Sequence, residues 1–176
     1  MPRIASITAA LVCGVAALVC AAPEAGADAA DDCMPPPPGL VQDLYDWIGA
    51  NSDYEVAAAK ADPPEIIFCI EGEEVPYGAK TTMISPREMG IFDFEERRIY
   101  LVAPWRVEVP RDVGVLLHEL VHDVQFLNRD WPCPGATEIE AYKLYEDWLA
   151  EQGVEIELNW LMIYMWSRCP RDIHPD

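Results

Sequence analysis

The stretch VGVLLHELVHDVQFLNRD, residues 113–130, contains the pattern His-Glu-x-x-His at residues 118–122. On an α-helix, residues four apart lie about 40° apart around the axis and one turn apart along it, so His118 and His122 project side by side. Their imidazoles can share one metal ion. Glu119 lies about 100° from His118, where it can reach a water on that metal without being a ligand. The pattern predicts a zinc (Zn2+) site with Glu119 as the general base.

The alternative is a pair of surface histidines on an ordinary amphipathic helix. The chain has 3 histidines, and two of them fall within the pattern. A buried histidine pair without a metal would need other polar partners. The flanking residues are apolar and predict that the helix is buried: Val115, Leu116, Leu117, Leu120, Val121 and Val124. These observations favour the metal site.

A catalytic zinc site uses three protein ligands and leaves a fourth position open. Gln125 and Asn128 occupy the positions at which a glycine and a third histidine would extend the pattern, so the third ligand must come from elsewhere. The next predicted helix contains TEIEAYKLYEDWL, residues 137–149, in which two glutamates compete. Glu138 shares its stripe with the apolar side chains, whereas Glu140 lies on the largely wet side. We expect Glu138 to be the ligand and Glu140 to be solvated or to support a ligand; should Glu138 fail, Glu140 or an aspartate such as Asp130 is the substitute.

The two motifs HELVH, residues 118–122, and EIEAY, residues 138–142, together resemble the gluzincin branch of zinc metallopeptidases. In that family the HExxH helix is followed by a helix with an ExxA or ExxxD motif. The resemblance spans roughly residues 97–150 and implies metal ligands at His118, His122 and Glu138, with the general base at Glu119. Ala141 matches the small residue that lets the two helices approach.

Two positions depart from the family pattern. Tyr142 stands where the family has an Asp or Asn that supports a histidine, and Asp123 is a charge where an uncharged residue is usual. The strand RRIYLVAP, residues 97–104, matches the edge strand that zincins place beside the metal to hold an extended peptide. The alternative is a plain core strand. An oxyanion donor is also expected, and Tyr142, Tyr145 and His174 are the candidates.

The resemblance therefore implies an α+β, minimal zincin-like fold with a small β-sheet or hairpin, the HExxH helix and the ligand helix. The implied function is hydrolysis of peptide bonds in a peptide or protein substrate. One alternative is a non-catalytic secreted zinc-binding or interaction domain, although an intact Glu119 argues against it. A third interpretation is an acidic, disulfide-linked interaction protein without metal.

The N-terminus predicts export. Arg3 is followed by an apolar run without an acidic or basic residue before Glu24. Residues 25–27 offer an Ala-x-Ala cleavage site, and residues 19–21 are a second candidate. We expect a signal peptide over residues 1–27, a proline-rich lead-in over 28–39 and one domain over 40–176. A membrane anchor is the alternative, but the run barely reaches the roughly 20 residues that span a bilayer. The expected location is secreted or periplasmic, with no stable membrane insertion after signal removal.

Charge and cysteine content fit this picture. The net charge of −19 makes nucleic acid a poor partner, because phosphate binding needs clustered Lys and Arg. Four cysteines lie beyond the signal peptide, and an even number in an exported domain predicts two disulfides. Of the three possible connectivities, we favour Cys33–Cys69 with Cys133–Cys169.

Local patterns predict the remaining elements. Thr137 is a plausible cap for the ligand helix. We expect the final helix to pack against the core. The predicted helices lie within residues 40–52, 110–128, 136–153 and 154–168, a strand within 65–70, and a hairpin within 90–102.

Overall fold

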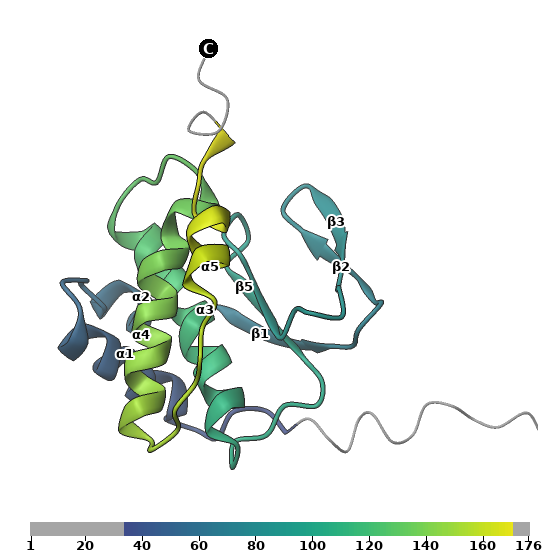
Figure 1. The fold of residues 1–176 in the computed structure, drawn as a ribbon. Helices are drawn as coiled ribbons and strands as arrows, with labels where there is room; N and C mark the ends of the chain where they lie inside the picture. Colours follow the sequence, from purple (N-terminus) through teal and green to yellow (C-terminus); the bar gives the residue numbers. More distant parts are fainter. Residues whose placement is uncertain (1–33, 171–176) are drawn as a thin grey trace, which may run out of the picture.

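The computed structural model describes residues 34–170, and these form an α+β fold, as the sequence predicts (Figure 1). None of the described helices is long and apolar enough to cross a membrane. The helices are α1 Leu40–Asn51, α2 Ala57–Ala61, α3 Pro110–Asn128, α4 Glu138–Glu151 and α5 Trp160–Trp166, with a 3-10 turn η1 Pro134–Thr137. The strands are β1 Glu65–Cys69, β2 Glu74–Tyr77, β3 Lys80–Met83, β4 Gly90–Asp93 and β5 Arg98–Val102.

The strands form two small sheets. In the larger sheet the order is β1-β5-β4, with β1 parallel and β4 antiparallel to β5, while β2 and β3 pair separately as an antiparallel hairpin. The predicted hairpin over residues 90–102 is confirmed. The expectation that residues 97–104 supply an edge strand is wrong, because β5 is the central strand and pairs with β1 on one side and β4 on the other. The edge strand beside α3 is β4.

Helix α3 is the centre of the hydrophobic core and has the predicted bounds. Pro110 stands in its first turn, where a missing N–H costs nothing, and the helix ends at Asn128. It packs against α1, α4, β4 and β5. Buried residues surround almost its whole circumference, and those with no exposed surface include Leu116, Leu117, Leu120, Val121 and Val124. A helix buried on this scale is positioned rigidly, which matters for any side chain it carries.

Two small residues let α3 and α4 approach closely. A Cβ added at Gly114 would lie only 2.6 Å from Cε2 of Tyr145 on α4. Ala141, the small residue three positions after Glu138, has no exposed surface. The close approach brings the first turn of α4 next to the middle of α3.

A buried charge pair joins the hairpin to α3. Asp123 has no exposed surface and accepts hydrogen bonds from Nε of Arg97 at 2.9 Å and from the hydroxyl of Tyr45 at 2.7 Å. Arg97 lies in the β4–β5 turn and also donates to Asp62 at 2.9 Å. The unusual charge after the HExxH motif is therefore compensated, as a buried carboxylate must be.

The prediction of a final helix over residues 154–168 packed against the core is wrong in length and in burial. Gly153, with φ 73°, turns the chain at the end of α4, and residues 154–159 then run beside α4 without helical structure (Figure 1). Only Trp160–Trp166 is helical, and of these residues only Ile163 is buried. The inner side of α4 already packs against α3, so most apolar side chains of α5 find no core to enter.

The start of α4 is held by a disulfide and not by the predicted cap. The hydroxyl of Thr137 donates to the carbonyl of Pro134 at 2.6 Å, because η1 runs into α4 with Thr137 already helical. The predicted disulfide between Cys133 and Cys169 is present and links the loop before α4 to the segment that follows α5. The other predicted pair includes Cys33, which lies outside the described residues.

Candidate metal centre

Three side chains converge where α3 meets the first turn of α4. The Nε2 atoms of His118 and His122 lie 3.1 Å apart, and the Glu138 carboxylate lies 3.5 Å from the first and 3.8 Å from the second. One ligand atom from each residue falls within 4.8 Å of the others. Ligands at the usual zinc distances in a tetrahedral site are about 3.3 Å apart. The three residues therefore fit a zinc ion both in ligand type and in spacing.

Gln125 orients His122 and was not found from the sequence. Its amide Nε2 donates to the carbonyl of Thr137 at 3.1 Å, which fixes the amide orientation and leaves Oε1 to face Nδ1 of His122 at 3.0 Å. Because that oxygen only accepts, Nδ1 carries the proton and the lone pair of Nε2 faces the site. Gln125 has no exposed surface. The available signal was its position three residues after His122, on the same side of α3.

Electrostatics favour a neutral His122 and an ionised Glu138. Burial, followed by the charge of His118, lowers the pKa of His122 to about 4. Burial opposes ionisation of Glu138, but the pKa of that carboxyl is lowered on balance, chiefly by the hydrogen bond from His118. Burial opposes protonation of His118, but the same hydrogen bond, with the charges of Glu119 and Glu138, raises its pKa. A neutral imidazole and a carboxylate are the forms that bind zinc.

Glu119 is almost completely buried beside the cluster, with 5% of its surface exposed. Burial, with a contribution from Glu138, raises its pKa to about 7, although the charge of His118 acts in the opposite direction. A carboxylate with a pKa near neutrality is suited to accept and return a proton. Gly90 on β4 leaves the necessary space, because a Cβ there would lie 2.8 Å from Oε1 of Glu119. Sequence reasoning did not identify this glycine.

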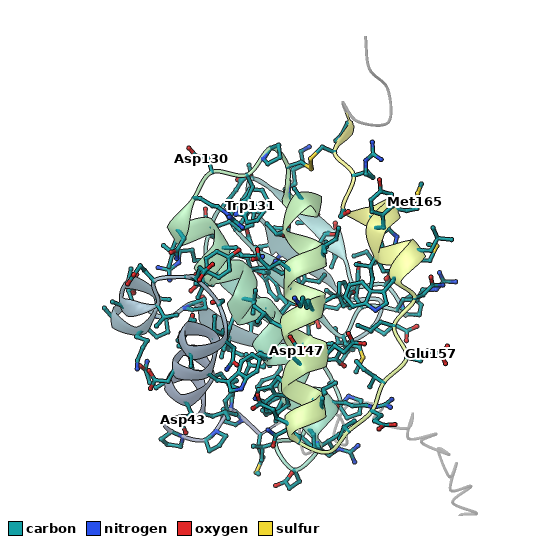
Figure 2. The ribbon with its side chains drawn as sticks, turned by 60° about the vertical axis from the view of Figure 1, so that its left-hand side comes forward. Asp43, Asp130, Trp131, Asp147, Glu157 and Met165 are labelled. Atoms are coloured by element: carbon teal, nitrogen blue, oxygen red, sulfur yellow. A yellow bond between two sulfur atoms is a disulfide. The ribbon has the colours of Figure 1, made fainter. Side chains whose placement is uncertain are left out.

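Glu140 lies apart from the three converging residues, on the other side of the first turn of α4. Its Oε2 accepts from Arg129 at 2.9 Å and from the hydroxyl of Tyr54, and Nε2 of Gln125 approaches it at 3.5 Å. Its side chain is 44% exposed. The structure thus brings Glu138 and not Glu140 into the cluster, and Asp130 projects from the loop at the far end of α3 (Figure 2).

The two tyrosines considered as donors both lie near His118. The ring centroid of Tyr142 is 4.5 Å from that of His118, and the ring of Tyr145 is 6.3 Å away. Burial, followed by the charge of Glu138, raises the pKa of Tyr142 to about 12, so its hydroxyl keeps its proton at neutral pH. The third candidate, His174, lies outside the described residues.

The cluster opens into a cleft of about 760 Å³. Strand β4 forms one wall, and Leu158 and Trp166 lie on the wall formed by the C-terminal segment. The backbone carbonyl of Met89 accepts a hydrogen bond from the N–H of Val102 at 2.9 Å. In an antiparallel pair every second residue bonds to the partner strand, so the backbone groups of Gly90 and Phe92 point away from β5. Four of the residues that line the cleft are aromatic and contact one another: Tyr77, Phe92, Phe94 and Phe126.

Comparison with known proteins identifies the family but not an activity. The model of the family described as "Domain of unknown function (DUF6647)" matches residues 34–176, and the chain belongs to that family. Searches of curated proteins and of solved structures returned no match.

Proposed function

We propose that this member of the DUF6647 family is a secreted zinc-dependent metallopeptidase with a minimal zincin-like fold. The observation that carries the proposal is the convergence of His118, His122 and Glu138 beside the buried carboxylate of Glu119. The resemblance of the HELVH and EIEAY motifs to those of gluzincins supports it. Secretion is proposed from the N-terminal sequence, and a disulfide is the kind of bond that persists in an oxidising compartment.

The zinc ion would be held by His118, His122 and Glu138, and its chemistry is to polarise a carbonyl group and to lower the pKa of water to about 7. Glu119 takes one proton from the attacking water as the water oxygen bonds to the carbonyl carbon. The same carboxyl group then delivers that proton to the amide nitrogen as the C–N bond breaks. Burial of the Glu119 carboxyl raises its pKa, which favours retention of the proton between the two steps.

The remaining groups of the cleft position the peptide. The outward backbone groups of Gly90 and Phe92 can pair with an extended chain as one more strand of the sheet. One of these groups, the carbonyl of Phe92, accepts a hydrogen bond of 3.3 Å from the hydroxyl of Tyr77, which a bound peptide would replace or bridge. Both tyrosines keep their protons at neutral pH, and Tyr142 is the better candidate for donating to the oxyanion because its ring lies 4.5 Å from that of His118, against 6.3 Å for Tyr145.

Zinc content and cleavage of an unstructured protein, measured on the same sample, test the proposal. We expect one zinc per chain and cleavage by the wild type. Glu119→Gln should keep its zinc, but its cleavage rate should fall by roughly 10²–10⁴-fold, the typical contribution of general base catalysis. Full zinc with equal activity in wild type and variant would overturn the mechanism. Zinc without any cleavage would favour the non-catalytic zinc-binding domain, and absence of zinc would favour the metal-free interaction protein.

The choice of third ligand has a matched test in two neighbouring glutamates. Glu138→Gln should weaken zinc binding strongly, because it replaces a carboxylate ligand within the cluster. Glu140→Gln changes a glutamate on the same turn that binds Arg129 instead, so its zinc affinity should change little. Retention of zinc by the first variant together with its loss by the second would reverse the assignment.

A further inference from the structure

Helix α5 exposes an unusually apolar surface. Ile163 is its only buried residue, at 2% exposure, whereas the others range from 38% at Trp160 to 71% at Leu161. A helix that is apolar on all sides normally lies inside a protein, and contiguous exposed apolar surface marks interaction sites. We call this surface the α5 face; it consists of Trp160, Leu161, Met162, Tyr164, Met165 and Trp166.

The α5 face is held in a fixed position. At the start of the helix, the side chain of Asn159 accepts a hydrogen bond from the backbone of Met162 at 3.1 Å. Near its end, a Cβ at Gly135 would overlap the carbonyl oxygen of Trp166, so the helix rests directly on η1. The Cys133–Cys169 disulfide closes the same contact. A preformed surface loses little conformational entropy on binding.

The α5 face is continuous with the cleft. Trp166 belongs to the face and also lines the cleft that contains His118 and Glu138. Leu158, which precedes α5, lines the same wall. On the β4 side, Met89 lines the cleft and is 52% exposed. A polypeptide that leaves the cleft between Met89 on one side and Trp166 on the other would reach the surface of α5.

Charge separates the possible occupants. The chain carries a net charge of −19, and Glu155 and Glu157 lie in the segment 154–159 that precedes α5. Figure 2 shows Glu157 and Met165 projecting on the same side of the molecule. Anionic lipid head groups would be repelled by this side, because membrane surfaces attract basic and not acidic segments. The two methionines instead suit apolar polypeptide side chains of varied shape.

We propose that the α5 face is an exosite, which binds an apolar segment of an unfolded polypeptide while a neighbouring segment of that chain occupies the cleft. This inference rests on the proposed peptidase function and adds the substrate class: unfolded chains with apolar stretches, in place of short or polar peptides. Because the exosite lies outside the cleft, it contributes to binding and not to the chemical step.

The test compares two synthetic peptides. The long peptide has a cleavable centre followed by an apolar segment, and the short peptide is the centre alone. The test variant is Leu161→Ser with Met165→Ser, because neither residue lines the cleft. The matched control is Met34→Ser with Ile70→Ser, which changes two residues of comparable exposure, 61% and 50%, outside the α5 face.

Binding is measured first, by fluorescence anisotropy with the zinc-loaded full chain carrying Glu119→Gln. We expect the Kd for the long peptide to rise at least tenfold in the α5 variant and to stay unchanged in the control. The Kd for the short peptide should not change in either. In chains that retain Glu119, KM for the long peptide should rise with kcat unchanged.

Four results would overturn the exosite. The first is an equal Kd for the long peptide in the parent and the α5 variant, and the second is an equal loss of affinity for the short peptide in that variant. The third is self-association of the parent that the variant abolishes, and the fourth is binding of the parent to phosphatidylcholine vesicles that the variant abolishes. The last two would assign the face to a second copy or to a membrane. A tenfold difference in Kd, together with no cleavage of either peptide by the zinc-loaded chain that retains Glu119, would support the exosite and refute the peptidase function.

Discussion

Gln125 links the two halves of the candidate metal site, and its replacement by leucine separates metal affinity from fold stability. In the wild type its amide accepts from Nδ1 of His122 and donates to the carbonyl of Thr137, the residue directly before Glu138. Leucine has a similar volume but makes neither hydrogen bond. The substitution therefore releases one ligand imidazole and the start of the ligand helix together.

The magnitude follows from the burial of both partners. His122 is 7% exposed and Thr137 is 1% exposed, so water does not readily replace the lost bonds. A buried polar group left without a partner costs about 1–3 kcal/mol. Two such groups would lower the free energy of unfolding of the protein without zinc by roughly 2–6 kcal/mol. Loss of a residue that orients a ligand typically weakens metal binding by about 10–100-fold.

Two measurements check the reasoning: zinc affinity by chelator competition and metal-free stability by urea unfolding. Gln125→Glu should keep zinc affinity near that of the wild type, because its carboxylate still accepts from His122. Its stability should fall, because it cannot donate to Thr137 and approaches Glu140. Gln42→Leu is the control, because the Gln42 amide donates to the Lys60 carbonyl, away from the cluster, and this variant should change neither zinc affinity nor stability greatly. Wild-type zinc affinity in Gln125→Leu would refute the orienting role.

Two further predictions concern stability alone. Asp123→Ala removes the buried partner of a charge pair and should lower the free energy of unfolding by about 3 kcal/mol. This value is at the lower end of the cost of breaking a buried charge pair, because the Arg97 side chain is 26% exposed. Asp62→Ala removes an 86% exposed partner of the same arginine and should cost less than about 1 kcal/mol in urea unfolding; equal losses would contradict the account. Replacement of Cys133 and Cys169 by serine opens a loop with a sequence separation of 36 and should cost about 4 kcal/mol, and an unchanged melting temperature would show that the loop is restrained by other contacts.

Local sequence determined the elements that form through contacts between near neighbours. Pro110 and the apolar period of the following residues predict α3 with its observed ends. The charged turn within residues 90–102 predicts the β4–β5 hairpin, which pairs as expected. The helical phase of TEIEAYKLYEDWL also distinguishes Glu138 from Glu140, because only one of them shares the buried stripe that faces α3. Spacing along one helix is enough to bring His118 and His122 together, since it follows from helix geometry alone.

Tertiary structure decided what depends on partners distant in the sequence. β5 is central and β4 is the edge because β1 pairs with residues 98–102, and no local pattern encodes that pairing. Gln125 acquires its role only because packing of α4 on α3 places the carbonyl of Thr137 within hydrogen-bonding distance. The apolar pattern of residues 154–168 predicts a core helix, yet α5 stays exposed because α3 already covers the inner side of α4. Apolar periodicity shows that a segment has surface to bury, whereas the space left by the rest of the fold determines whether that surface is buried.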